Sequence, residues 1–235
     1  MENIIECTAL TKKYGDLCAL NNVSLTVPAS GGIVALLGPN GSGKTTLIKL
    51  LTGLLQPSKG SLRVAEMPIG VETKAVVSYL SDSYSLHESY TVREELDYHA
   101  DFFADFDRCK AETMLRDLSI KDASKIKSLS KGTKEKLALI LTLSRNAKLY
   151  IFDEPIAGVD PAAREYVLNT ILSNRSKEST ILLSTHLISE IEQSFDHVIF
   201  LRQGNVVLDG PAKEVRKAHG KTIDALFREV FKWTY

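Results

Sequence analysis

Three short apolar runs stand out along the chain, and a helical pattern follows each of them. The runs are GIVALL (32–37), KLYIF (148–152) and TILLS (180–184). Their near-continuous hydrophobicity is typical of strands buried on both faces, as in a parallel sheet covered by helices. Apolar positions then recur at helical spacing in residues 44–55, 162–174 and 187–195. This alternation predicts an α/β fold with a mainly parallel sheet.

The two ends of the chain follow a different pattern. Apolar and polar residues alternate around ALNNVSLTV (19–27), which predicts antiparallel strands joined by a turn at KKYGD (12–16). Near the other end, HVIFLRQGNVVLDG (197–210) predicts a hairpin that turns at 203–205. We expect a charged helix to follow from about Ala212.

The segment from Leu86 to Ala147 shows no strand pattern and is rich in charged and aromatic residues. We therefore expect several helices there, forming a lobe inserted into the α/β core. The whole chain, 1–235, is expected to be a single domain. Residues 1–85 and 148–235 would form the core with its antiparallel part, and residues 86–147 would form the lobe.

Composition argues against several classes of protein. Lys and Arg number 29 and Asp and Glu number 29, so bulk charge does not favour nucleic acid or acidic lipid as a partner. We expect no nucleic-acid partner.

Cys7, Cys18 and Cys109 are odd in number and widely spaced, which fits neither a disulfide framework nor a zinc site. The start MENIIECTAL is unlike a signal peptide, and the longest apolar run, LALILTL, is too short to span a membrane. These features indicate a cytoplasmic protein that reaches a membrane only through a partner.

The first buried strand runs into a phosphate-binding pattern. Residues 38–45 fit G-x-x-x-x-G-K-[ST], with a strand before them and a helix after them. The glycines allow successive N–H groups to curl around phosphates, Lys44 adds a positive charge, and the Thr45 hydroxyl can bind Mg²⁺. The candidate phosphate-binding residues are Gly38, Pro39, Asn40, Gly41, Ser42, Gly43, Lys44, Thr45 and Thr46.

Polar residues also follow the other two buried strands. Asp153 and Glu154 directly follow KLYIF. A carboxylate at the end of a buried strand is costly to desolvate unless a cation or a reacting group is close to it. Asp153 is a candidate ligand of Mg²⁺, and Glu154 a candidate for orienting the attacking water. The alternative is that both cap the next helix. His186 follows TILLS and is a candidate γ-phosphate contact, with a purely structural role as the alternative.

A second anion-binding pattern lies in SLSKGTKEKLALI (128–140). Ser130, Lys131 and Gly132 stand where a helix leaves backbone N–H groups unpaired, and the apolar positions start only at Leu137. Unpaired N–H groups and the helix dipole both favour negative charge.

Taken together, these motifs resemble the ATP-binding subunits of ABC transporters, over nearly the whole chain and in the family's order. Tyr14 matches the aromatic residue that stacks on adenine, and GPNGSGKTT matches the phosphate loop. LYIFDEP matches the strand that carries the magnesium ligand and the general base. AGVDP, with Asp160, matches the D-loop, and STH, with His186, the switch histidine. The resemblance implies a P-loop NTPase (RecA-like) core.

The resemblance also explains the second anion-binding pattern, because LSKGT is similar to the family's signature LSGGQ. In that family, the signature of one subunit meets the ATP held by the phosphate loop of another. Ser130 and Gly132 are then expected at the ATP of a second copy or of a homologous ATPase subunit.

Two positions depart from the family's pattern. Lys131 and Thr133 replace a glycine and a glutamine of the signature, and Lys131 either strengthens ATP-driven closure or extends into solvent. Asp82, in SYLSDSYSL, stands where the family has a glutamine that touches Mg²⁺. Asp82 is either a carboxylate ligand of the metal or, if the loop is displaced, a residue in solvent.

The helical segment also carries aromatic residues. We expect most of these to form the core of the lobe, while the family presents a groove there to its membrane subunit. The candidates for that docking surface are Tyr84, Tyr90 and Phe103.

The resemblance implies an ATPase that binds ATP and Mg²⁺ and powers transport, with export favoured, through a separate transmembrane permease subunit. It would lie peripherally on the cytoplasmic face of the cell membrane. The alternative is a soluble ABC-type ATPase that acts on ribosomes, DNA or an assembly machinery. A small-molecule phosphotransferase would explain neither LSKGT nor AGVDP.

Overall fold

The computed structural model describes the chain except residues 1, 30, 84, 156–160, 175–177 and 233–235, and except the side chains of 161–163 and 174. The strands are β1 (Asn3–Tyr14), β2 (Leu17–Pro28), β3 (Gly32–Leu37), β4 (Lys59–Val64), β5 (Met67–Pro68), β6 (Val77–Leu80), β7 (Leu149–Asp153), β8 (Thr180–Ser184), β9 (His197–Arg202) and β10 (Asn205–Pro211). The helices are α1 (Lys44–Leu51), α2 (Val71–Val76), α3 (Val92–Phe102), α4 (Arg108–Asp117), α5 (Lys131–Leu143), α6 (Pro161–Asn174), α7 (Ile188–Ile191), α8 (Ala212–His219) and α9 (Ile223–Val230), with short 3-10 helices η1 (Ile126–Ser128) and η2 (Glu192–Ser194).

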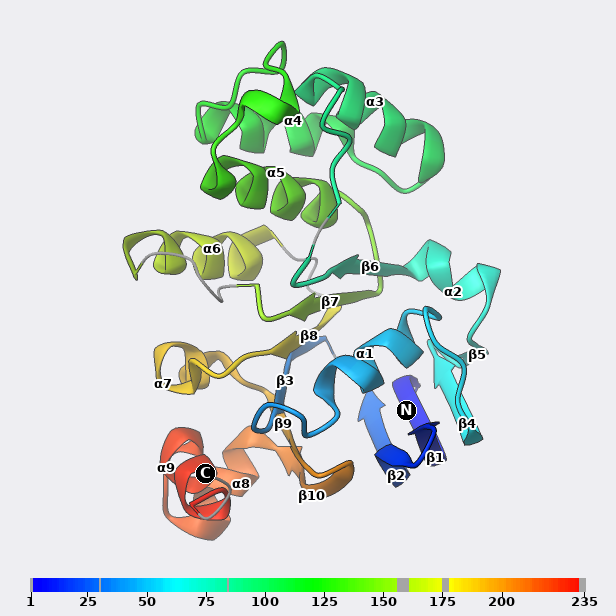
Figure 1. Cartoon of the computed structure of the whole chain (residues 1–235). Helices are drawn as coiled ribbons and strands as arrows, with labels where there is room; N and C mark the ends of the chain where they lie inside the picture. Colours follow the sequence, from blue (N-terminus) through cyan, green and yellow to red (C-terminus); the bar gives the residue numbers. More distant parts are fainter. Residues whose placement is uncertain (1, 30, 84, 156–160, 175–177, 233–235) are drawn as a thin grey trace.

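Two sheets organise the molecule (Figure 1). The larger has the strand order β10-β9-β3-β8-β7-β6, and all its neighbours are parallel except the β9–β10 hairpin. The smaller has the order β2-β1-β4-β5 and is antiparallel. This arrangement confirms the predicted α/β fold with a mainly parallel sheet and an N-terminal antiparallel part.

The strands β3, β7 and β8 of the larger sheet are buried on both faces, which explains their continuous hydrophobicity. On β3, Ile33, Ala35 and Leu37 belong to one apolar core, which includes residues of α3, α4, α5 and α6. Val34 and Leu36 face the other core, which includes residues of α1 and of the smaller sheet. Alternate residues of one strand thus join the two halves of the molecule.

Helices α3, α4 and α5 lie together at one end of the molecule, between β6 and β7 in the chain (Figure 1). The segment 86–147, all of which is described, holds these helices and η1 and no strand. The boundaries of a separate lobe at 86 and 147 remain a proposal. Among the described residues, no helix has the length and apolar character that crossing a bilayer requires.

Some elements differ from the sequence-based expectation. The helix predicted over 44–55 ends at Leu51, because Gly53 adopts a left-handed conformation with φ of 73° and closes the helix. The helix predicted over 187–195 splits into α7 and η2. β4, β5, β6, α2 and α9 were not predicted; in β4, only Leu62 and Val64 are buried, so its pattern is weak.

Candidate functional site

The register of the large sheet brings the polar strand ends to one edge. Leu36 of β3 pairs with Ser184 of β8, and Ser184 pairs with Asp153 of β7. Phe152 of β7 pairs with Leu80 of β6. Since parallel strands end at the same edge, the phosphate loop, the acidic pair and the segment that contains Asp82 all start from one row of the sheet.

The phosphate loop needs glycine at two positions because of close packing. A Cβ on Gly38 would lie 2.4 Å from the backbone oxygen of Leu201, and one on Gly43 would lie 2.6 Å from that of Ala19. Gly43 is also the N-cap of α1, with φ of 108°, a left-handed value that side chains disfavour. The loop therefore leads directly into the helix, where unpaired N–H groups attract anions.

Lys44 is buried against this loop. Its Nζ donates hydrogen bonds to the backbone oxygens of Gly38 (2.7 Å) and Pro39 (3.3 Å). Burial lowers the pKa of Lys44, and the negative charges of Glu154 and Asp153 oppose that shift. The ammonium group and the two carboxylates thus share one site.

Asp153 has the features of a ligand for a divalent cation. It is 1% exposed, and its Oδ1 accepts a hydrogen bond of 2.6 Å from the Ser184 hydroxyl. No partner for its buried Oδ2 is found in the described part of the chain. Thr45, at the start of α1, is half-buried nearby in the loop. One hydroxyl and one carboxylate fit Mg²⁺, which usually takes its other ligands from phosphates and water.

The described residues contain no group of three or more His, Cys, Asp and Glu side chains that could hold a metal ion.

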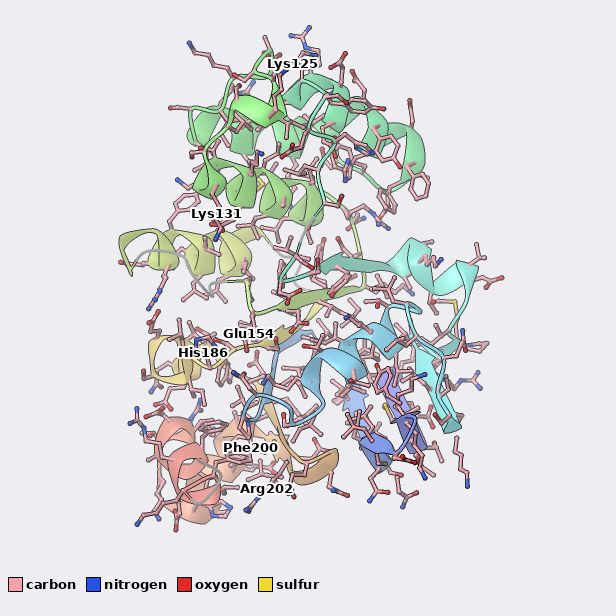
Figure 2. The ribbon with its side chains drawn as sticks, in the orientation of Figure 1. Lys125, Lys131, Glu154, His186, Phe200 and Arg202 are labelled. Atoms are coloured by element: carbon pink, nitrogen blue, oxygen red, sulfur yellow. The ribbon has the colours of Figure 1, made fainter. Side chains whose placement is uncertain are left out.

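Glu154 and His186 contact each other. Nδ1 of His186 lies 2.8 Å from Oε2 of Glu154, so the imidazole donates to the carboxylate (Figure 2). The backbone N–H of Glu154 donates to the Ser184 hydroxyl at 2.9 Å, and Glu154 has a left-handed φ of 51°. The hydrogen bond from His186 holds the carboxylate, and the contact with Ser184 holds the backbone of Glu154 at the end of β7. Ser184 was missed by sequence reasoning, although it ends the predicted strand TILLS.

A hollow of about 490 Å³ brings most of the predicted residues together. Its lining includes Tyr14, Leu17, Cys18, Ala19, Asn40, Gly41, Ser42, Gly43, Lys44, Thr45, Thr46, Asp82, Glu154 and Gln203. Tyr14 and Leu17 are 44% and 67% exposed, so an apolar surface is available for a planar ring at this end. Asp82 is exposed within the lining, and Leu17, Cys18 and Gln203 were not predicted.

The second anion-binding pattern lies elsewhere, at the start of α5. Ser130 is the N-cap of this helix, and its Oγ accepts a hydrogen bond of 3.2 Å from the N–H of Thr133. A Cβ on Gly132 would meet nothing within 4 Å, so the helix start is open. In the described part of the chain, neither Ser130 nor Gly132 lines the hollow. Asp160 lies outside the described residues.

Lys131 extends into solvent in the single chain. Its side chain is 82% exposed, and its nearest acidic partner is Glu135, at 4.0 Å (Figure 2). The charge is therefore available to an anion on another molecule.

Comparison with known proteins gives a consistent result. A family model described as "ABC transporter" matches residues 20–157. The ABC transporter ATP-binding protein YhaQ of Bacillus subtilis is 30% identical over 217 residues, which are 90% of this chain and 72% of that protein. Nod factor export ATP-binding protein I of Rhizobium johnstonii is 33% identical over 215 residues, which are 88% and 68%. A solved ATP-binding subunit of an ABC transporter is 29% identical, with a TM-score of 0.85 over 96% of this chain and 98% of that chain.

Proposed function

The chain belongs to the ABC transporter family as a relative of its ATP-binding subunits, and from this we propose that it hydrolyses ATP to power transport. Export is the favoured direction, as in the similar Nod factor export protein. One observation carries the proposal. The hollow combines a phosphate loop with Glu154, whose carboxylate accepts a hydrogen bond from His186. The preceding residue, Asp153, is buried at the end of β7, and its Oδ2 has no partner in the described part of the chain.

Binding of the phosphates falls to the loop and Lys44. The ammonium group now donates to Gly38 and Pro39, and transfer to phosphate oxygens would replace neutral acceptors with charged ones. Thr45 and Asp153 would hold Mg²⁺, with Asp82 as a further ligand. When bound there, Mg²⁺ neutralises the charge that develops on the phosphates. Tyr14 would stack on the base.

The hydrolytic step is assigned to Glu154 and His186. A water molecule attacks the γ-phosphorus, Glu154 accepts a proton from that water, and the bond to the leaving ADP oxygen breaks. The hydrogen bond from His186 fixes the orientation of the carboxylate. Contact of His186 with the γ-phosphate after ATP binds remains part of the proposal.

A second subunit completes the site. Ser130 and Gly132 of one subunit would approach the ATP of the other, together with Asp160, and a twofold arrangement fills both sites at once. The partner is a second copy or a homologous ATPase subunit. Closure driven by ATP binding and reset by hydrolysis would be passed to the membrane.

The membrane partner is proposed to dock on the helical part. A second hollow of about 320 Å³ is lined by residues of β6, α3 and α5, including Phe102 and Phe103. Phe102 is 67% exposed and Tyr98 39% exposed, whereas Tyr90 and Phe103 are half-buried and Tyr84 lies outside the described residues. Exposed aromatic residues concentrate interface energy, so Phe102 and Tyr98 are the better candidates for contact with a permease subunit. The protein would then lie peripherally on the cytoplasmic face of the membrane, with no nucleic acid involved.

The proposal is tested with Glu154→Gln, which keeps the shape of the side chain but removes its basicity. Hydrolysis should fall by about two orders of magnitude or more, while ATP stays bound and holds two chains together. Size-exclusion chromatography with ATP should show a dimer.

Lys44→Ala provides the matched control. It should lose nucleotide binding and remain a monomer under the same conditions. A Glu154→Gln protein that binds ATP but elutes only as a monomer would contradict the mechanism.

A further inference from the structure

The β9–β10 hairpin is fastened to the phosphate loop and to β2 at the same residue. The N–H of Gly204 donates to the backbone oxygen of Ser42 at 2.9 Å. The backbone oxygen of Gly204 accepts from the N–H of Asn21, also at 2.9 Å. The turn of this hairpin therefore connects β2 to the phosphate loop, and residues of both segments line the hollow.

Gly204 fits only because it lacks a side chain. A Cβ there would lie 2.8 Å from the backbone oxygen of Ala19, and its φ of 76° is left-handed. Gln203, the preceding residue, also has a left-handed φ, of 47°. This turn places an exposed amide side chain on the wall of the hollow.

The neighbouring polar side chains already have hydrogen-bond partners. Nη1 of Arg202 donates to the backbone oxygen of Val230 at 3.5 Å. Nδ2 of Asn21 donates to Oδ1 of Asn205 at 3.1 Å. For the Gln203 amide, no hydrogen bond is found in the described part of the chain.

Gln203 lines the hollow next to a residue that contacts both β2 and the phosphate loop. If Tyr14 and Leu17 take the base and the loop around Lys44 takes the phosphates, the sugar must lie between these two ends. Gln203 projects from the turn that joins β2 to the loop, and an amide can both donate to and accept from a hydroxyl. We propose that Gln203 hydrogen-bonds a sugar hydroxyl of the bound nucleotide and so positions the triphosphate; this rests on the proposed function.

The test measures the dissociation constants of ATP, 2′-deoxy-ATP and 3′-deoxy-ATP for the full chain and for Gln203→Ala. The variant should bind ATP about threefold to tenfold more weakly, the range of one neutral hydrogen bond. For the full chain, one of the two deoxy nucleotides should show the same loss, and Gln203→Ala should bind that nucleotide and ATP equally. Val207→Ala is the matched control, because Val207 is 46% exposed on the same hairpin and does not line the hollow; it should keep the affinity for ATP.

The outcomes separate this proposal from the function itself. Equal ATP affinity of the full chain and Gln203→Ala overturns the role of Gln203 and leaves the ATPase function intact. An equal loss for ATP and both deoxy nucleotides also overturns it, because the contact would not involve the sugar. If the full chain binds no ATP, the proposed function falls, and the role of Gln203 falls with it.

Discussion

At the scale of single residues, one hydroxyl organises the two acids of the site. Ser184 Oγ donates to Asp153 and accepts from the N–H of Glu154. A buried carboxylate is stable only when it is paired. The hydrogen bond from Ser184 satisfies only one of the two carboxylate oxygens of Asp153, Oδ1. No partner for the remaining oxygen, Oδ2, is found in the described part of the chain, and this supports the proposal that Asp153 binds Mg²⁺.

Asp82 should influence how tightly that metal is held. Asp82→Asn keeps the size of the side chain and removes one negative charge from the lining of the hollow. If the carboxylate contacts the metal, activation of hydrolysis should require several-fold more Mg²⁺. A magnesium titration of ATPase activity measures the shift.

Asp101→Asn is the control for this prediction, because Asp101 is exposed on α3, away from the hollow. Its titration should match that of the unmodified chain. If the curves of Asp82→Asn and Asp101→Asn coincide, Asp82 is not a ligand.

The sequence predicted those site residues that belong to spaced motifs. Strong strand and turn patterns lead to Lys44, Glu154 and Tyr14, so their convergence in the hollow could be predicted. The same strand pattern predicted Asp153, which lies beside Glu154 at the end of β7. Gln203 and Ser184 could not be assigned a role in this way. Their contacts depend on sheet register and on the packing of a hairpin against a loop, and neither is encoded in local spacing.

At the scale of elements, the start of α5 combines a structural and a proposed binding role. Ser130→Ala removes the N-cap and should cost about 1 kcal/mol of stability. Ser130→Asp should keep the cap, since aspartate also accepts from the helix N–H groups, but it places a negative charge where the partner's ATP is expected. ATP-dependent dimers of Glu154→Gln should therefore be lost with Ser130→Asp although the melting temperature is preserved.

The matched control uses a cap far from the site. Thr222 caps α9, and its Oγ1 accepts from the N–H of Ala225 at 3.1 Å. Thr222→Ala should lower the melting temperature and leave the dimer intact. A dimer that persists with Ser130→Asp would show that the start of α5 does not contact the ATP of the partner subunit.

Helix α9 shows what the sequence could have revealed. The charged helix predicted from about Ala212 is confirmed as α8, which stops at Gly220 with a left-handed φ of 62°. Thr222 then starts α9, which was not predicted. A glycine followed by a threonine cap is a readable signal. The packing of Phe227 and Phe231 against Phe200 of β9 was not readable, because it depends on the position of the sheet.

At the scale of the whole molecule, two anion-binding features remain separate within one chain. The hollow around Lys44 lies at the edge of the large sheet, and the open start of α5 lies on the helical part. The proposed pairing with a second chain would give both features a function, since each would supply what the other lacks. The fold class was predictable because burial on both sheet faces leaves continuous apolar runs. The expectation of a contact between subunits came only from the resemblance to a known family.

Crosslinking tests most directly whether the phosphate loop of one chain meets the start of α5 of a second chain. Asn40 is exposed on the phosphate loop and Gly132 has open space around it, so Asn40→Cys and Gly132→Cys can be combined in the Glu154→Gln chain. Cys18 and Cys109 are replaced by serine. Cys7 can stay, because burial raises the pKa of its thiol to about 12 and keeps it unreactive.

The measurement is the yield of covalent dimer on a denaturing gel after treatment with a short thiol-reactive crosslinker, with and without ATP. The account predicts a dimer band that appears with ATP and is absent when Lys44→Ala is added. A chain that binds ATP but gives no ATP-dependent crosslink between residues 40 and 132 would contradict it.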